Sequence, residues 1–525
     1  MTMTRSYPAR NSIALAAICL SSLMFGLEIS SVPVILPTLE KLLHAGLRDM
    51  QWIMNAYTIA CTTVLMAAGT LADRYGRKRI FIISLGLFAI TSLICGLAQS
   101  TALLIVSRFL QGMGGGAMLI CQVAILSHQF QQGRERSRAF AVWGVIFGIG
   151  LGFGPIIGGM IVALSSWHWV FLVHVPLTVI TLLLAVNGVK ESRDPLAERL
   201  DIAGIVTLSG SVFGLTYYIT KGPELGFASL PALGILGVAV ISFFIFLWVE
   251  KRSQHPMFDF SVFRIRNFSG AIIGSMGMNF SFWPFMIYLP VYFQSGLGYD
   301  ILAAGLSLLA YTLPTLVLPP LAERLSLRYQ PRIVIPAGLL TIGLGFFLMR
   351  AGSNADHASW LTMLPGSLLA GIGLGLTNTP VTNTTTGSVP GNRAGMASGI
   401  DMSARLITLA INIAMMGFIL LEGTLSYLRV AISPSDLGTL SSDARRSLPD
   451  LAGIRLPELA ERIAAGNFAS LRQDFPGLSS LDPAGTIVHH ALIHGFGWVL
   501  LYGGIGVCIL AFISFLIFGS ARLPD

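Results

Sequence analysis

The chain has 525 residues, of which 54% are hydrophobic and only 11% are charged, and its mean hydropathy is +0.74. A soluble globular chain carries about 25% charged residues, so this composition excludes a water-soluble protein and predicts one embedded in lipid. In a soluble chain the formal net charge of +8 would suggest nucleic acid as a partner. Here the basic residues lie in short loops between apolar runs, which indicates membrane orientation and no nucleic-acid binding.

The first apolar run, residues 12–36, follows two arginines and could be a signal peptide. It is too long for one and shows no small-residue cleavage site, so we expect a retained first span. About fourteen segments are long enough to cross a bilayer as helices, since lipid offers the backbone no other partner. In chain order they are 12–36, 50–72, 80–98, 102–127, 138–164, 167–189, 201–220, 229–249, 268–293, 301–322, 332–350, 361–383, 394–420 and 491–519. The predicted fold is an all-α membrane protein.

The distribution of Lys and Arg predicts the orientation. With the N-terminus inside, the inward loops hold most of the basic residues. The short outward loops hold only Lys41, Arg48, Lys221 and Arg350. This excess predicts an even number of spans, with both termini cytoplasmic. The five cysteines stand singly and form no CxxC pair, so we predict neither a metal site nor a disulfide.

Charged residues inside spans are functional candidates, because burying charge in lipid is costly. Glu28 lies about 13 Å from the outer end of the first span, and Arg108 lies about 10 Å from the same face. Because the depths match, we expect the two side chains to meet, with Glu28 as the main proton acceptor. A static ion pair that only fixes packing is the alternative. The lone intramembrane histidines, His174 and His494, are expected to be satisfied within the core.

The loop after the second span reads Gly69-Thr-Leu-Ala-Asp73-Arg74-Tyr-Gly76-Arg77-Lys78. Gly69 allows close approach of helices, and Asp73 can accept hydrogen bonds from amides at the next helix start. A plain positive-inside loop is the alternative.

A degraded copy of this loop, at residues 321–328, follows the tenth span. This weak repeat predicts an N-terminal six-helix half (1–189), two inserted helices with a cytoplasmic loop (190–266) and a C-terminal half (267–525).

Three later features complete the set of candidates. A glycine run in the fifth span permits close packing and a bend, or serves packing alone; it contains Gly150, Gly154, Pro155, Gly158 and Gly159.

Asp401 and Arg405 share one helix face. They would carry a second proton or contact a cationic substrate, unless Asp401 simply snorkels to water. The polar outward segment 423–490 is expected to be a connector, with a lid or a partner-docking hairpin as the alternative.

Polar and aromatic side chains within the spans are candidates for a substrate cavity, because aromatic walls with few polar groups suit lipophilic ligands. Many aromatic side chains near the ends of spans belong instead to the aromatic belts at the membrane interface. We therefore expect fewer than half of the candidates to touch a ligand. The candidates are Asn55, Tyr57, Asn279, Trp283, Tyr288, Tyr292, Gln294, Tyr311, Asn378 and Asn383.

Four motifs carry a family resemblance. The loop at 69–78 resembles the signature loop of the major facilitator superfamily. Segments 27–37, 108–114 and 150–159 resemble the first-, fourth- and fifth-helix motifs of its fourteen-helix drug:proton antiporter family, and 167–171 continues the likeness. Glu28 stands where that family usually has Asp, Pro33 where it has Asn, and Asp401 where relatives commonly carry Asn. The resemblance weakens within 423–490.

The resemblance implies two six-helix bundles plus two inserted helices, in the inner membrane. It implies proton-coupled export of lipophilic compounds such as drugs or toxic cations, without a cofactor. Asp73 and Arg77 would form a gating latch, supported by Gly69, Arg74 and Gly76. Some relatives work with a periplasmic adaptor, which no residue here indicates.

Other classes of function are weighed against this one. An exporter of an anionic metabolite or siderophore would use Arg108 and Arg405 as substrate contacts. A membrane enzyme would need a nucleophile or a metal cluster at a membrane face, and we find neither; no GxxxxGK[ST] loop indicates ATP as the energy source. A non-transporting sensor would need a sizeable extramembrane domain, and only 423–490 is available for one.

Overall fold

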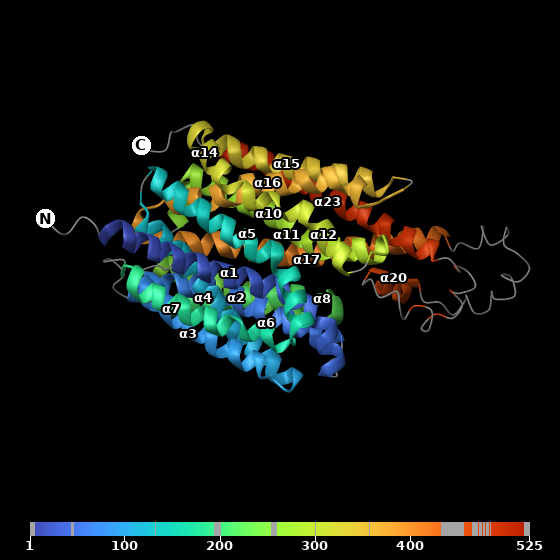
Figure 1. Ribbon diagram of the computed structural model, residues 1–525, viewed down its shortest axis with the longest axis horizontal. Coiled ribbons are helices and arrows are strands. Elements are labelled where there is room, and N and C mark those ends of the chain that lie inside the picture. The colour runs from blue at the N-terminus through green and yellow to red at the C-terminus, as the bar shows by residue number, and fades with distance from the viewer. Residues whose placement is uncertain are drawn as a thin grey trace, which may run out of the picture.

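The structure is a computed structural model, and it describes residues 6–43, 47–131, 133–193, 201–253, 260–299, 301–355, 357–431, 456–464, 471, 475, 478, 482 and 485–518. Within these residues the regular elements are helices. Figure 1 shows them running side by side along the long axis of the molecule.

In the part of the chain that the structure describes, residues 6–253 form nine helices. They are α1 (Ser6–Leu42), α2 (Leu47–Tyr75), α3 (Arg77–Gly96), α4 (Thr101–Gln129), α5 (Gly133–Leu164), α6 (His168–Leu172), α7 (His174–Gly188), α8 (Ile202–Leu225) and α9 (Leu230–Arg252). The short α6 and α7 together make one apolar stretch of the length of a span.

The second part begins with a short 3-10 turn, η1 (Phe260–Arg264). It continues with α10 (Arg266–Phe280), α11 (Phe282–Val291), η2 (Tyr292–Gly296), α12 (Ile301–Thr312), α13 (Pro314–Val317), α14 (Pro319–Tyr329), α15 (Pro331–Ser353), α16 (Trp360–Gly387), η3 (Gly391–Arg393), α17 (Ala394–Ala431), α20 (Leu456–Ala464) and α23 (Thr486–Ile517). Proline divides α12, α13 and α14, because its ring nitrogen has no hydrogen to donate to the preceding turn.

The number of spans agrees with the prediction. Twelve helices in the described residues are long and apolar enough to cross a membrane, and the number rises to 14 when each of two bent pairs is counted as one span. The bent pairs lie at 52–75 and 303–329, and each bends by 48°. The expectation of an all-α membrane fold is therefore confirmed.

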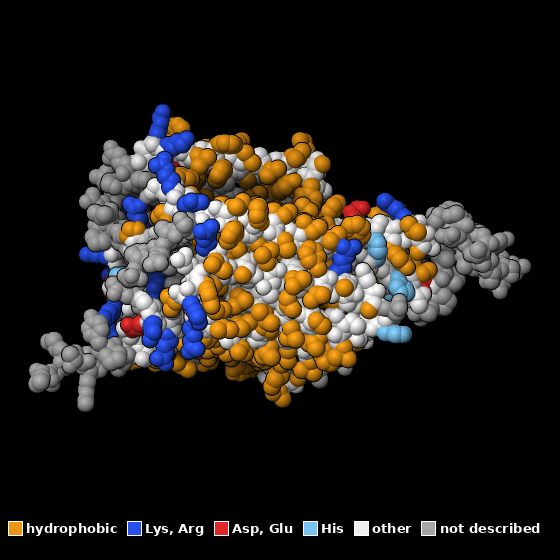
Figure 2. All heavy atoms as spheres, turned by 90° about the horizontal axis from the view of Figure 1, so that it is seen from above, with side chains coloured by type: hydrophobic (Ala, Val, Ile, Leu, Met, Phe, Trp, Pro, Cys, Tyr) orange, Lys and Arg blue, Asp and Glu red, His pale blue; other side chains and the backbone are white. Residues whose placement is uncertain are grey.

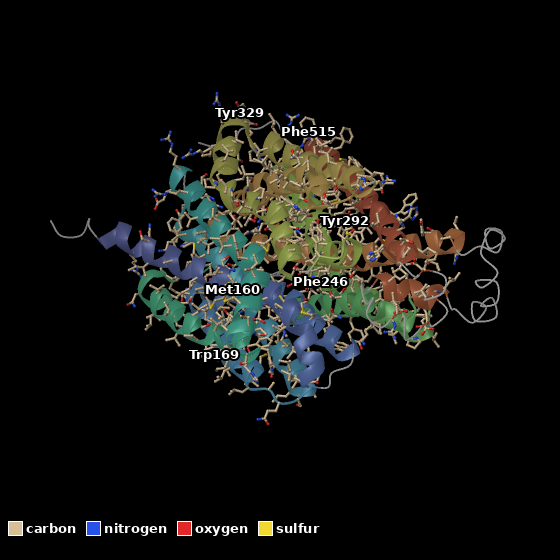
Figure 3. The ribbon with its side chains drawn as sticks, turned by 45° about the vertical axis from the view of Figure 1, so that its right-hand side comes forward. Met160, Trp169, Phe246, Tyr292, Tyr329 and Phe515 are labelled. Carbon is tan, nitrogen blue, oxygen red and sulfur yellow. The ribbon has the colours of Figure 1, made fainter. Side chains whose placement is uncertain are left out.

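Buried apolar side chains gather in separate cores. One core is built from residues of α1 to α5 and α7, with Met402 of α17 added. A larger one is built from residues between Ala271 and Phe518. Figure 3 places Trp169 of the first part and Tyr329 and Phe515 of the second on opposite sides, with Phe246 of α9 between them. The exact boundaries 1–189, 190–266 and 267–525 stay a prediction.

The inserted helix α8 lies against both parts of the molecule. It packs on α2 and on α17, and the hydroxyl of Ser209 donates to the carbonyl of Thr63, with 3.2 Å between the oxygens. Its neighbour α9 turns Ile241, Phe244 and Trp248 outward. These apolar outward side chains suit contact with lipid chains.

The two ends of the molecule differ in charge. Figure 2 shows Lys and Arg gathered in a band at one end, beside a broad apolar surface. Arg266 donates to the carbonyl of Ile517 at 3.0 Å, so the start of α10 and the end of α23 meet.

The segment predicted as a loop at 423–490 is partly helical. α17 continues to Ala431 and α23 begins at Thr486, because the backbones of Gly423 and Gly495 lie close enough to pack these helices together. α20 buries Leu459 and Ile463 in the larger core. Residues 432–455 lie outside the described part of the chain.

Candidate functional site

Glu28 and Arg108 meet, as predicted. Glu28 lies on α1 and Arg108 on α4, both side chains are fully buried, and Nη1 of Arg108 donates to Oε1 of Glu28. Nη1 also donates to Oε1 of Gln111 at 2.7 Å, and Nε donates to the carbonyl of Ile53 at 3.0 Å. The guanidinium carbon lies 4.5 Å from the ring centre of Tyr57. A buried charge held by several acceptors and a ring face is fixed in place.

His174, which sequence reasoning set aside as a satisfied core residue, belongs to the same cluster. It lies at the start of α7 and is buried, with its Nδ1 3.4 Å from Oε2 of Glu28. Its Nε2 lies 3.2 Å from the carbonyl oxygen of Met24. The sequence does show a titratable residue in the sixth span. It does not show that this residue contacts Glu28, because the two lie far apart in the chain.

Asp401 and Arg405 also pair, on one face of α17. Nε of Arg405 donates to Asp401 at 3.2 Å, and its two Nη atoms donate to Asn378 and Thr382 of α16, each at 2.7 Å. Ser275 of α10 donates to Asp401 at 2.5 Å. Because Asp401 is fully buried, the alternative of an Asp snorkelling to water is wrong for this conformation.

The predicted latch residues connect the two parts of the molecule. Arg77 donates from Nε and Nη2 to Oδ1 of Asp73, at 2.9 and 2.7 Å. Arg77 also donates to the carbonyl of Gly391 at 3.1 Å, and the amide of Met396 donates to Asp73 at 3.1 Å. A Cβ at Gly69 would lie 2.9 Å from the carbonyl oxygen of Gly395. The missing side chain at Gly69 therefore lets α2 approach α17.

The turn between α2 and α3 depends on Gly76. Its φ of 111° lies in a region that residues with a Cβ rarely adopt. The carboxylate of Glu191, a residue that sequence reasoning missed, accepts from the amides of Lys78 and Arg79 at 3.1 and 3.2 Å. It satisfies donors at the start of α3 that Asp73 was expected to serve. Within the described part of the chain, Arg74 joins none of these latch contacts; its guanidinium lies 5.3 Å from the ring of Tyr75.

Arg136 forms a second bridge at the same end, which the sequence did not single out. From α5, its Nε donates to Oδ1 of Asn383 at 2.7 Å and its Nη2 to Thr386 at 2.8 Å. Asn383 in turn donates to Glu323 of α14 at 2.7 Å. Asn383, a candidate for the substrate cavity, is thus occupied by a contact between the two parts.

The glycine run brings α5 onto α1. A Cβ at Gly150 would lie 2.7 Å from the carbonyl oxygen of Leu23, and Ser30 donates to the carbonyl of Gly150 at 3.0 Å. Gly154 faces Ser30 and Gly158 faces Ser31 at similarly close range. Pro155 and Gly159 lie within the same helix.

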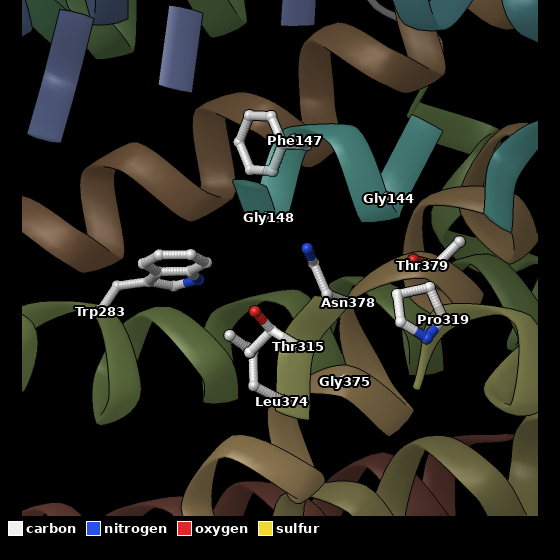
Figure 4. A pocket seen from close by; sticks show the side chains of 10 residues that line it. All are labelled: Gly144, Phe147, Gly148, Trp283, Thr315, Pro319, Leu374, Gly375, Asn378 and Thr379. Atoms are coloured by element: carbon white, nitrogen blue, oxygen red, sulfur yellow. The ribbon is translucent and has the colours of Figure 1, made fainter. Parts of the chain in front are cut away.

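A small cavity lies between α5 and the second part of the molecule. Figure 4 shows Asn378 pointing toward α5 between Trp283 and Thr379. The volume open to the centre of a water molecule is only about 10 Å³, enough for about one water. Its lining is Gly144, Phe147, Gly148, Trp283, Thr315, Pro319, Leu374, Gly375, Asn378 and Thr379.

Trp283 and Asn378 are the candidate cavity residues that line this space. Asn279 donates to Ser275, Tyr288 to Ile413 and Tyr311 to Phe282, in each case to a backbone carbonyl. Tyr57 lies beneath Arg108, Asn55 is half-buried, Tyr292 is buried in the larger core and Gln294 is exposed.

Comparison with known proteins places these features in context. The sequence profile of the Major Facilitator Superfamily matches residues 18–412. Multidrug resistance protein Stp of Mycobacterium tuberculosis is 33% identical over 78% of this chain and 75% of its own length. The tetracenomycin C resistance and export protein of Streptomyces glaucescens is 28% identical over 97% of this chain and 92% of its own. Quinolone resistance protein NorB of Staphylococcus aureus is 28% identical over 78% and 88%.

Solved structures give the same fold. The proton:xylose symporter XylE aligns with a TM-score of 0.58 and 13% identity, covering 96% of this chain and 95% of its own. The human organic anion transporter MFSD10 aligns with a TM-score of 0.58 and 15% identity, covering 77% and 93%. At these identities the likeness concerns the fold alone.

Proposed function

This chain belongs to the Major Facilitator Superfamily, and from that membership we propose that it exports small lipophilic compounds, such as drugs or toxic cations, in exchange for protons. It is a membrane transporter and not an enzyme. Relatives that match it are named for multidrug resistance, for export of tetracenomycin C and for quinolone resistance. These names support efflux as the direction of transport.

The buried pair of Glu28 and Arg108 is the observation that carries the proposal. A carboxylate with no exposure to water is costly within a membrane, which makes it a functional candidate. Proton binding would neutralise Glu28 and weaken its attraction to Arg108. The packing between α1 and α4 would then change with the proton, as a coupled transporter requires.

Transport would proceed by alternating access. We place the end that carries the latch and the band of Lys and Arg (Figure 2) at the cytoplasmic face of the inner membrane, with both termini there. The half 1–189 would move against the half 267–525, with 190–266 between them. The contacts of Asp73 with Met396 and of Arg136 with Asn383 would then close the cytoplasmic side.

The second buried carboxylate, Asp401, would bind a second proton or support the cavity. It connects with the cavity because Arg405 joins it to Asn378, which lines that space. Every side-chain nitrogen of Arg405 donates to a protein oxygen. An anionic cargo would have to displace such a partner, so the arrangement favours a lipophilic or cationic cargo over an anionic metabolite or siderophore.

Transport in reconstituted liposomes tests the proposal. Purified protein would be driven by an imposed pH gradient, with ethidium as a cationic probe and salicylate as an anionic one. We expect ethidium movement coupled to counterflow of protons, and at least a tenfold loss of coupled transport in Glu28→Gln, since removing about 1.4 kcal/mol of coupling changes an equilibrium tenfold.

Two results would contradict the proposal. Wild-type proton exchange by Glu28→Gln would remove Glu28 as the proton acceptor. Gradient-driven salicylate movement without ethidium movement would favour the anionic cargo. Asp401→Asn, measured in the same way, separates a second proton from a supporting role through the number of protons exchanged for each ethidium.

A further inference from the structure

The second oxygen of Glu28 has a neighbour that the proposed mechanism leaves unused. Oε1 is bound by Arg108, whereas Oε2 faces Nδ1 of His174 at 3.4 Å. Within the described part of the chain neither Oε2 nor Nδ1 has another hydrogen-bond partner. Both side chains are at most 1% exposed, so bulk water does not separate them.

The other ring nitrogen determines which tautomer His174 adopts. Nε2 lies 3.2 Å from the carbonyl oxygen of Met24, and a carbonyl oxygen can only accept a hydrogen bond. Nε2 must therefore carry the hydrogen. In a neutral imidazole with hydrogen on Nε2, Nδ1 presents a lone pair.

We propose that Glu28 and His174 share one proton between Oε2 and Nδ1, so that the proton site of this transporter is the pair and not the carboxylate alone. Without that proton a lone pair would face a carboxylate oxygen in a dry site, which is repulsive. With it, either the carboxyl group donates to Nδ1 or the imidazolium donates to the carboxylate. The inference rests on the proposed proton coupling.

The remaining groups around the pair supply one fixed charge. Arg108 on α4 is the cation, and Gln111 beside it is neutral. Among the described residues, Tyr57 of α2 and Cys95 of α3 are further titratable side chains that interact with Glu28. α1 contributes the carbonyl of Met24, and α3 also contributes Phe88, whose ring meets that of His174 edge-on.

The proton therefore decides the net charge of the cluster. With it, Glu28, His174 and Arg108 together carry one positive charge; after release they carry none. A row of rings links the cluster to the cavity, because Phe147 of the cavity wall lies 6.4 Å from Phe25, and Phe25 lies 6.4 Å from Tyr57, between ring centres. A cationic cargo at that wall would be disfavoured while the proton is bound, which is the competition that antiport needs.

Histidine NMR on the full-length protein in lipid nanodiscs tests the shared proton directly. With ¹⁵N-labelled histidine, His174 would be followed from about pH 5 to about pH 9. We expect Glu28→Gln to leave Nδ1 without its hydrogen at pH values where wild-type Nδ1 still carries one, because the charge that stabilises the imidazolium is gone. His494 is the matched control, since its Nδ1 meets the carbonyl of Gly423 at 3.2 Å, and its titration should not change.

Transport provides the second readout. His174→Gln should move the pH profile of ethidium–proton exchange to lower pH by about one unit, whereas His494→Gln should leave the profile in place. A merely structural role of His174 would lower the rate equally at every pH.

The inference is overturned if His174→Gln leaves the pH profile of ethidium–proton exchange unchanged. It is also overturned if Nδ1 of wild-type His174 carries no hydrogen at every pH where exchange occurs. If His174→Gln does not fold, the comparison of wild type with Glu28→Gln by NMR still decides. Failure of the proposed function gives a different result from failure of this inference. In that case Glu28→Gln would exchange protons for ethidium at the wild-type rate, with or without a change at His174.

Discussion

Arg108 illustrates, at the scale of single residues, how much geometry one side chain can fix. It reaches Glu28, Gln111 and the carbonyl of Ile53 at once. A lysine has one nitrogen and no fork, so Arg108→Lys would keep the charge and lose part of this set. We expect coupled ethidium transport to fall by at least about tenfold, the effect of losing about 1.4 kcal/mol, measured as initial rates in liposomes. Arg350→Lys, in a partly buried residue at the end of α15, should keep near wild-type rates; equal rates in both variants would contradict the prediction.

Gly76 is the residue of the latch loop whose backbone conformation excludes a larger side chain. Its φ of 111° and the carboxylate of Glu191 beside it leave no room for a methyl group. We expect Gly76→Ala to lower stability by about 1–3 kcal/mol, seen as a lower melting temperature of the purified protein. Gly86→Ala on α3, where a Cβ would meet no atom within 4 Å, should melt at or above the wild-type temperature. A similar loss in both variants would rule out the backbone explanation.

Contacts between whole helices follow from small residues, and α1 with α5 is the clearest case. A Cβ at Gly150 would lie 2.7 Å from the carbonyl oxygen of Leu23, and backbone cannot move aside as a side chain can. We expect Gly150→Ala to cost about 1–3 kcal/mol and to slow transport, by melting and by liposome assay. Gly237→Ala on α9 has open space around it and should be neutral. No difference between the two would show that the close approach is unimportant.

At this scale the sequence predicts a great deal. Each predicted span corresponds to a helix or to a run of shorter helices, because an apolar run of about 20 residues has no stable alternative in lipid. The ends were predicted less well. α17 continues past 420 to Ala431, since packing of Gly423 on Gly495 depends on a partner helix far away in the chain.

For the whole molecule, the polar contacts of Arg136 are among those that join the two parts at the latch end. Arg136→Ala would remove the donor to Asn383 and Thr386. In a background without the five native cysteines, Asn378→Cys would report access to the cavity. We expect labelling by an impermeant maleimide in inside-out vesicles to rise at least about fivefold, the effect of about 1 kcal/mol.

The control for that experiment is Arg138→Ala, an exposed residue two positions along α5. It removes the same charge without the contact to Asn383. Equal labelling in Arg136→Ala and Arg138→Ala would mean that charge alone, and not the bridge, holds this end closed.

Site residues could be predicted where burying their charge in lipid is costly, or where they belong to a recognisable motif. Glu28 with Arg108 and Asp73 with Arg77 both pair in the structure. His174, Arg136 and the capping role of Glu191 were not predicted, because each depends on which distant helix lies opposite. Local sequence carries no information on that choice.

The small size of the cavity between α5 and the second part of the molecule has a consequence for how tightly a cargo binds there. A cavity for a drug-sized ligand needs roughly 300–1,000 Å³, far more than the about 10 Å³ found here. A drug-sized cargo does not fit this cavity as it stands, so the apparent Kd of a cargo that binds there is its intrinsic Kd divided by the fraction of molecules in which the cavity is open. A change at the bridge of Arg136 with Asn383 should thus rescale the apparent affinities of all cargoes by one common factor, whereas a change at Trp283 should reorder them.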